Sequence, residues 1–141
     1  MGVAENKAVV AEHIRHFPEY TEKALATGDP SHLAVDFTDD FCWIMPKSIP
    51  RAGAHCGMEE VLEFLRQGLG LFEPGTMRTE ILGMIGEDDY VAVRVHCTAR
   101  STKGRDYDNE YHVLYRLRDG KICEMWDYQD TLHFWQVCYA D

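Results

Sequence analysis

The chain has 141 residues, which is enough for one domain with a single hydrophobic core. Its 45% hydrophobic content, with three Trp, seven Tyr and six Phe, excludes a disordered chain. The formal net charge of -10 argues against nucleic-acid binding, because phosphate-contacting surfaces are built from clustered Lys and Arg. A neutral or apolar small molecule is therefore the expected ligand.

No apolar run reaches the roughly 20 residues that span a bilayer, and residues 1–7 are too polar for a secretory signal. We therefore expect a cytoplasmic protein that binds no membrane. The cysteines are odd in number and lack the C-x-x-C spacing of zinc sites, so we expect reduced, mostly buried thiols. They are Cys42, Cys56, Cys97, Cys123 and Cys138.

The first half of the chain has the apolar periodicity of helices. Residues 5–27 repeat apolar side chains at helical spacing, and Pro18 predicts a kink or a restart within this helix. A short second helix is expected over residues 32–36, with Ser31 as its cap. Aromatic and branched residues then predict a strand over residues 41–45.

A loop is expected over residues 47–56, followed by a third helix over residues 58–67. After Pro74-Gly75 the pattern becomes wholly β. Four strands are predicted, over residues 77–85, 90–100, 110–117 and 121–128. The sequence thus predicts one α+β domain spanning residues 1–141: a cone-shaped α+β barrel in which a curved, mostly antiparallel sheet wraps three N-terminal helices. A cavity between sheet and helices is the natural ligand site.

Four motifs occur in a characteristic order along the chain: G-D after the first helix, D-D-F-x-W, R-A-G-x-x-x-G, and L-R-D-G-K-I-x-E-x-W-D-Y in the last hairpin. In this order the chain resembles the nuclear transport factor two-like superfamily, and within it SnoaL-like polyketide cyclases and relatives of ketosteroid isomerase. The resemblance covers nearly the whole chain and implies the cone-shaped fold.

The resemblance also implies site residues. The three catalytic roles of ketosteroid isomerases fall near Thr21, Met45 and Val113, none of which can perform them, so the steroid-isomerase apparatus is not expected here. In SnoaL-like cyclases an Asp on the last strand is the acid or base, and Asp127 occupies the matching place. The accompanying His of that family falls at Val113, one residue from His112.

The face on which His112 lies depends on the register of the last hairpin, because a slip of one residue reverses the faces of a strand. If residues 119–120 form a two-residue type I′ turn, Arg118 pairs with Lys121 and His112 lies opposite Asp127.

In a three-residue loop with a glycine bulge, Leu117 instead faces Lys121, and Tyr111 lies opposite Asp127. We favour this second register, which leaves His112 on the outer face of the sheet. It places on the cavity side the residues that the resemblance requires, namely Asn109, Tyr111, Val113, Met125 and Asp127. His96, on the neighbouring strand, could reach Tyr111 if the turn at residues 103–104 is tight.

The function expected from these residues is cofactor-independent acid/base chemistry by an isomerase, cyclase or lyase (a dehydratase included) on a neutral cyclic or aromatic molecule. Asp127 would move the proton, its pKa raised by burial, while Tyr111 and Asn109 would hydrogen-bond a developing oxyanion. His112 and His96 are further catalytic candidates. Predicted pocket residues are Phe17, Trp43, Met45, Val61, Leu65, Val113 and Met125, with Arg51 at the mouth.

The alternative is a module of the same fold that binds a small molecule or a protein without catalysis. No metal is expected, because no acid or cysteine joins His13 and His16 at a recognised ligand spacing. The C-terminal residues Leu132, Phe134, Trp135, Val137 and Tyr139 are strongly apolar and should pack against something. Relatives of this fold commonly pair, which implies a homodimer through the outer sheet face.

Overall fold

A computed structural model of the chain describes residues 2–29 and 31–141 and has the predicted α+β fold. Its helices are α1 (Val3–Thr27), α2 (Ser31–Ala34), α3 (Met58–Leu69) and α4 (Thr131–Cys138). Its strands are β1 (Phe37–Met45), β2 (Gly53–Cys56), β3 (Arg78–Glu87), β4 (Tyr90–Arg100), β5 (Asp106–Arg118) and β6 (Lys121–Gln129).

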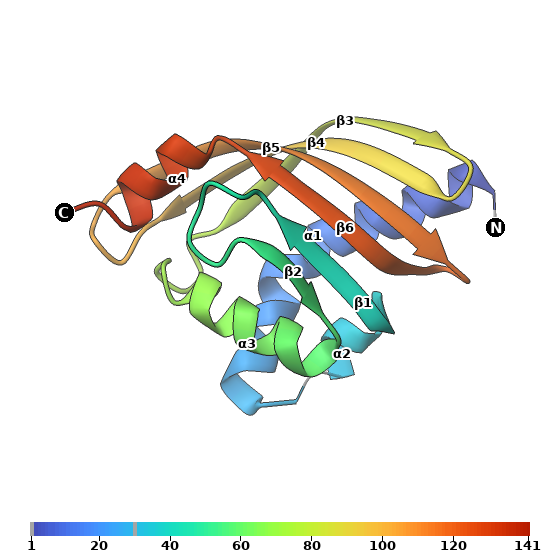
Figure 1. The fold of residues 1–141 in the computed structure, drawn as a ribbon, viewed down its shortest axis with the longest axis horizontal. Coiled ribbons are helices and arrows are strands. Elements are labelled where there is room, and N and C mark those ends of the chain that lie inside the picture. Colours follow the sequence, from blue (N-terminus) through green and yellow to red (C-terminus); the bar gives the residue numbers. More distant parts are fainter. Residues whose placement is uncertain (1, 30) are drawn as a thin grey trace.

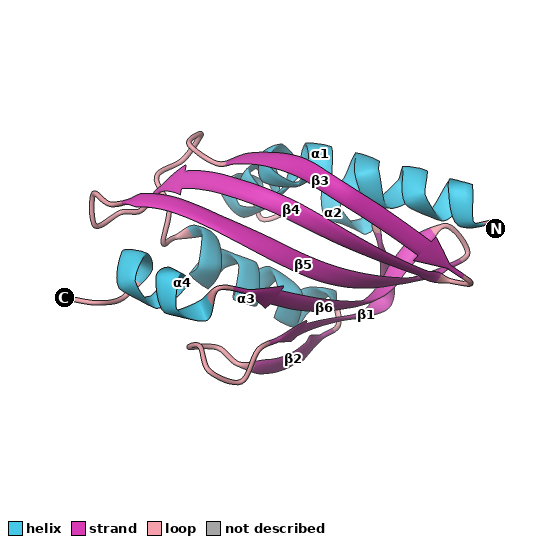
Figure 2. Ribbon diagram, turned by 90° about the horizontal axis from the view of Figure 1, so that it is seen from above, coloured by secondary structure: helices cyan, strands magenta, loops and turns pink. Residues whose placement is uncertain are grey.

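The six strands form one curved sheet that is not closed into a barrel, in the order β2-β1-β6-β5-β4-β3. β1 and β6 run parallel, and every other neighbouring pair is antiparallel. Figure 1 shows α1, α2 and α3 beneath the concave face of this sheet, with α4 at its far end. Seen from above in Figure 2, the long strands β3, β4 and β5 cross over the helical layer. The space between the two layers therefore holds the core and the candidate site.

Helix α1 continues through Pro18, so of the kink or restart that the sequence predicted there, the restart does not occur. Proline has no N–H to donate to the carbonyl four residues earlier, which here belongs to Ile14. The hydroxyl of Thr79 on β3 donates to that carbonyl oxygen instead, at 3.4 Å. The sheet thus satisfies the acceptor that the proline leaves free, and the helix runs on to Gly28, whose left-handed φ of 74° suits a residue without Cβ.

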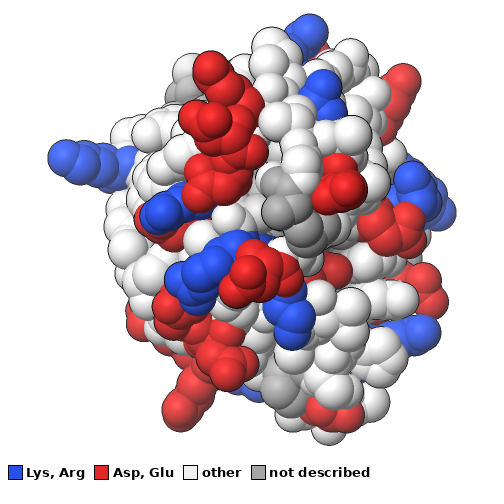
Figure 3. All heavy atoms as spheres, turned by 90° about the vertical axis from the view of Figure 1, so that its right-hand side faces the viewer, with Lys and Arg blue, Asp and Glu red and all other residues white. Residues whose placement is uncertain are grey.

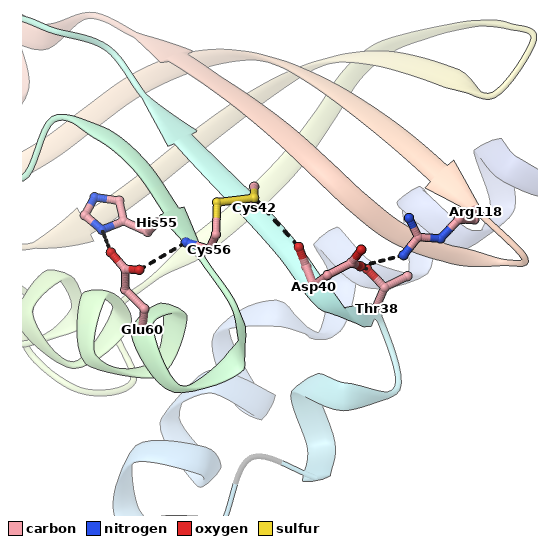
Figure 4. Close-up of a disulfide and its surroundings, with 7 residues drawn as sticks. All are labelled: Thr38, Asp40, Cys42, His55, Cys56, Glu60 and Arg118. Carbon is pink, nitrogen blue, oxygen red and sulfur yellow. Dashed lines mark hydrogen bonds and ion pairs between the residues drawn. A yellow bond between two sulfur atoms is a disulfide. The ribbon is translucent and has the colours of Figure 1, made fainter.

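Two cysteines contradict the prediction of reduced thiols. Residues 53–56, predicted as loop, form the edge strand β2 antiparallel to β1, and this pairing places Cys42 directly opposite Cys56. The two form a disulfide, with Cα atoms 4.1 Å apart. Figure 4 shows that Glu60 of α3 lies beside it, accepting the Cys56 backbone N–H at 3.4 Å. Cys97, Cys123 and Cys138 are free and buried, as predicted.

The apolar C-terminal segment is a fourth helix, α4, that the sequence analysis did not predict. The Asp130 carboxylate caps it by accepting the backbone N–H of His133 at 3.1 Å. Phe134 and Val137 are buried within the chain itself, whereas Trp135 stays 46% exposed. Much of this segment therefore packs against its own sheet rather than requiring a second copy to cover it.

The register of the last hairpin differs from both predicted alternatives at the position that matters. The turn is the two-residue form: Arg118 pairs with Lys121, and Asp119 and Gly120 both have positive φ. An irregularity follows at Cys123, so that farther along Val113 lies opposite Asp127. The inserted residue offsets the β5–β6 pairing by one. Val113 and Asp127 therefore lie on the cavity side and His112 on the outer face, as the favoured register predicted.

Among the described residues, none of the helices is both long enough and apolar enough to cross a membrane. Figure 3 views the end of the molecule that carries the N-terminus and the β3–β4 and β5–β6 turns. Acidic side chains are interspersed there with Lys and Arg, and no continuous basic patch covers this face. This mixture of charges accords with the formal net charge of -10.

Candidate functional site

A cavity of about 150 Å³ lies between the concave face of the sheet and helices α1 and α3. Its wall is mostly apolar, and its size is comparable to cavities that hold a single benzene ring. Of the predicted site residues, nine line it: Phe17, Trp43, Met45, Arg51, Leu65, Tyr111, Val113, Met125 and Asp127. The fold therefore brings these nine residues together at one cavity.

Asp127 is a carboxylate buried inside this apolar wall, with 5% of its surface exposed. The indole N–H of Trp43, on the parallel neighbour β1, donates to its Oδ2 at 3.1 Å. Its other oxygen, Oδ1, is buried without a hydrogen-bond partner among the described residues. Burial raises the pKa of Asp127 to about 6, although the Trp43 hydrogen bond opposes the rise. The group can therefore gain or lose a proton near neutral pH.

Tyr111 also lines the cavity, and its hydroxyl belongs to a hydrogen-bonded group that includes Gln129, another lining residue. It contacts the hydroxyl of Tyr107, which also accepts from the Asn109 amide at 2.7 Å and reaches Gln129 Oε1 at 3.2 Å. When the Tyr107 hydroxyl donates to Tyr111, the Tyr111 proton is free to bond a ligand. When Tyr107 donates to Gln129 instead, Tyr111 donates its proton to Tyr107 and none is left for a ligand. Burial raises the pKa of Tyr111 well above its usual value, so this hydroxyl stays a donor.

Four predicted site residues lie elsewhere. His112 is exposed on the outer face opposite Tyr128, because its side chain alternates away from that of Val113. His96 is also outside: it contacts Asp108 at 2.6 Å and does not reach Tyr111.

The other two predicted residues that miss the cavity are interior. Val61 is fully buried in the core without lining the cavity. Asn109 is 2% exposed but lies behind Tyr107, so it supports the tyrosine pair rather than the cavity surface.

Arg51 brings a cation to the cavity wall. Its guanidinium lies over the Phe64 ring, 4.6 Å from the centroid, and donates to the Phe64 carbonyl at 2.9 Å. Gly68 gives it room, since a Cβ there would come within 3.0 Å of Nη1. No carboxylate among the described residues pairs with Arg51, and its left-handed φ of 65° is unusual for a residue with Cβ. This charge is available to a polar group of a ligand.

Sequence reasoning missed a second polar centre on the helical side. His13 lines the cavity, and its Nδ1 contacts Asp36 Oδ2 at 2.9 Å; His16 Nε2 contacts the same oxygen at 2.6 Å. Asp36 joins the two histidines in space, although no acid stands at a recognised ligand spacing in the sequence, and the three groups have ligand atoms within 4.8 Å of one another. Burial alone would raise the pKa of Asp36, but the two histidines together outweigh it. The pKa of Asp36 therefore lies below its usual value.

Comparison with known proteins agrees with this architecture. The sequence pattern of the SnoaL-like domain matches residues 14–125. Curated proteins contain no significant match to the chain.

Three solved structures illustrate the likeness of fold. A candidate SnoaL-like polyketide cyclase from Jannaschia sp. CCS1 has a TM-score of 0.79 at 18% identity, covering 99% of this chain and 94% of that one. TerC, co-crystallised with polyporic acid, has a TM-score of 0.78 at 21% identity, covering 96% and 99%. An NTF2-like protein from Burkholderia xenovorans LB400 has a TM-score of 0.69 at 20% identity, covering 98% of both chains. These structures share the fold of this chain, and the match over residues 14–125 shows that the chain belongs to the SnoaL-like domain family.

Proposed function

We propose that this protein is a cofactor-independent acid/base enzyme, a cyclase, isomerase or lyase, that acts on a neutral cyclic or aromatic small molecule. The observation that carries the proposal is Asp127, a buried carboxylate with one unpartnered oxygen on the wall of an apolar cavity. Leaving a buried oxygen without a donor costs free energy, and such costs persist where a ligand or a reaction uses the group. Similarity to candidate polyketide cyclases supports the same class of reaction.

Asp127 acts as the base that removes a proton from the carbon beside a carbonyl group. The electron pair of the broken C–H bond moves toward the carbonyl oxygen, where negative charge develops. Tyr111 donates its hydroxyl proton to that oxygen when Tyr107 donates to Tyr111, and the apolar walls keep water from competing. Proton removal at such a carbon is the step that isomerisation, aldol-type cyclisation and elimination have in common.

The rival function is a binding module without catalysis. The cavity volume of about 150 Å³ suits a small aromatic ligand under either function. What favours the enzyme is the raised pKa of Asp127, because a proton-transfer group works best with a pKa near the working pH. A module that only needed shape would gain stability from an apolar residue at this position.

Hydrogen–deuterium exchange of 1-indanone tests the proposal. The ketone is neutral, cyclic and aromatic, and loss of its protons beside the carbonyl is followed by proton NMR in deuterated buffer. The wild type should accelerate exchange, with a rate that rises through a pH of about 6 as Asp127 ionises and then levels off.

The variant Asp127→Asn should lower the enzymatic rate by about 10²- to 10⁴-fold, the usual contribution of one general base. The matched control is Asp108→Asn, the same change at an exposed acid of β5 that bonds His96. If Asp127→Asn exchanges 1-indanone as fast as the wild type, Asp127 is not the base. If the ketone binds without any exchange, the binding module is the better description.

Two expectations from the resemblance stay predictions: a homodimer formed through the outer face of the sheet, and a cytoplasmic location. For the first, the outer face presents aromatic side chains of β4 and β6. Tyr128 is 58% exposed, and Tyr90 lies 6.4 Å from Trp126 between ring centroids. A second copy seated on this face would remove these rings from water.

A further inference from the structure

The helical wall of the cavity carries His13, and a hydrogen bond to a buried carboxylate fixes the orientation of its ring. His13 on α1 is 2% exposed, and its ring packs among Phe17, Phe37 and Tyr115, with centroids 5.1 to 5.8 Å away. Phe17 and Tyr115 also line the cavity with it. A polar ring held among aromatic side chains needs a reason in hydrogen bonding.

That hydrogen bond goes to Asp36, between α2 and β1, whose Oδ2 lies 2.9 Å from His13 Nδ1. A carboxylate only accepts hydrogen bonds, so Nδ1 carries the proton. The neutral ring then has its lone pair on Nε2, the nitrogen turned away from the carboxylate. Nε2 has no hydrogen-bond partner among residues 2–29 and 31–141. His13 thus lines the cavity with a ring that carries a basic nitrogen in a defined tautomer.

His16 makes Asp36 a firmer support for this arrangement. Its Nε2 donates to the same Oδ2 at 2.6 Å, although it does not line the cavity. Both hydrogen bonds favour the ionised form of Asp36, the form that accepts the His13 proton. Two donors thus keep one buried carboxylate charged. Burying a charged group costs desolvation free energy, and a neutral or apolar residue in this place would avoid that cost.

We propose that His13 is a second proton-transfer residue of the cavity, held by Asp36 so that its Nε2 accepts a proton from a hydroxyl group of the ligand. This inference rests on the proposed function, and it adds that the ligand carries a hydroxyl in addition to the carbonyl activated at Asp127. A carboxylate on the sheet wall and an imidazole on the helical wall can serve two ends of one small ring.

The step is a simple proton transfer. The O–H bond of the ligand breaks, its electron pair stays on the ligand oxygen, and the proton bonds to the lone pair of His13 Nε2. The resulting imidazolium lies against ionised Asp36, which stabilises its charge inside the protein. In the reverse direction the imidazolium returns the proton to an oxygen that leaves the ligand. Asp36 acts only through His13 and is a positioning residue.

Nitrogen NMR of the ¹⁵N-labelled protein tests this inference without requiring turnover, with 4-nitrophenol as a one-ring hydroxyl ligand. In the free protein, His13 should show a protonated Nδ1 and an unprotonated Nε2. Saturating 4-nitrophenol should shift the His13 Nε2 resonance and leave the His16 ring nitrogens nearly unchanged, because only His13 lines the cavity.

Two variants sharpen the result. His13→Asn keeps an N–H where Nδ1 was but removes the base. The absorption band of bound 4-nitrophenol should therefore lose the shift that a hydrogen bond to the base causes, and the phenol should bind at least several-fold more weakly. His16→Gln keeps its donor to Asp36 and should leave the His13 Nε2 shift intact.

A proton on Nε2 in the free protein, or an Nε2 that ignores the phenol, overturns the inference. So does tight Zn²⁺ binding that displaces the Nδ1 proton, because the cluster would then be a metal site. Failure of the proposed function appears separately, in the 1-indanone exchange of Asp127→Asn.

Discussion

Replacing Asp127 by Asn should stabilise the fold at neutral and higher pH while removing the proton-transfer group. Asn keeps the shape of the side chain and an oxygen to accept the Trp43 N–H, but it cannot ionise. The pKa of Asp127 is about 6 in the folded protein, against a usual value of 3.8. In the wild type, ionising Asp127 therefore opposes folding.

The size of the effect follows from the two pKa values. Well below pH 3.8 the group is protonated in both states and costs nothing. Between 3.8 and 6 the folded state binds more protons than the unfolded state, so stability falls as pH rises. At about 1.4 kcal/mol per pKa unit, the penalty is about 0.5 kcal/mol at pH 4 and about 3 kcal/mol at pH 8, where Asp127 is ionised in both states.

Urea unfolding of the wild type and Asp127→Asn at pH 4 and pH 8 measures this difference. Comparing the two proteins at each pH cancels the titration of the other acids. The stability gained by the substitution should increase by about 2 to 3 kcal/mol from pH 4 to pH 8. A gain that does not change with pH, or a variant less stable than the wild type at pH 8, would refute the claim that Asp127 is a buried, uncompensated carboxylate.

Removing the disulfide with the double substitution Cys42→Ser and Cys56→Ser should lower the free energy of unfolding by about 3 kcal/mol, since the bond closes a loop of 14 residues; urea unfolding with and without reductant checks this. Tyr111→Phe should slow 1-indanone exchange about 100-fold, as for loss of one oxyanion donor, with little change in stability; unchanged exchange would remove Tyr111 from the mechanism. His112→Ala should leave exchange intact and change stability by less than about 0.5 kcal/mol, because His112 is exposed on the outer face. Light scattering should give the mass of two chains for the wild type and of one for Tyr128→Glu; a single-chain mass for the wild type would contradict the dimer.

Local patterns predicted the long elements well because their signals come from near neighbours in the chain. The 3.6-residue period of α1 and α3 and the alternation of β4 and β5 need no tertiary information. Strand β2 was missed because its four residues, Gly53 to Cys56, include no β-branched or large aromatic side chain and follow Pro50. Helix α4 was missed because it is apolar around most of its circumference, so no period distinguished it.

The errors at the site arose from contacts between distant parts of the chain. The disulfide depends on the β1–β2 pairing, and that pairing was not predicted. The favoured three-residue loop was wrong, because the turn has two residues; the extra residue at Cys123 nevertheless restored the faces expected from that loop, and turn chemistry alone does not reveal a bulge three residues away. Asp36 lies 23 residues from His13, so only the packing of α1 against the segment after α2 brings them together.

The two buried acids near the cavity differ in their hydrogen-bonding environment, and this difference assigns their roles. Asp36 accepts two histidine donors, which lower its pKa; Asp127 accepts one indole donor, and burial raises its pKa to about 6. At a pH near 6, Asp36 is therefore a fixed charge, whereas Asp127 exchanges its proton. Pairs of titratable groups whose environments move their pKa values apart mark the anchor and the proton carrier of a site. The Trp43 hydrogen bond lowers the pKa of Asp127. Trp43→Phe removes this donor, so it should raise the pKa of Asp127 further and shift the rise of the 1-indanone exchange profile to higher pH. A profile that shifts to lower pH in Trp43→Phe would show that some other group governs the reaction.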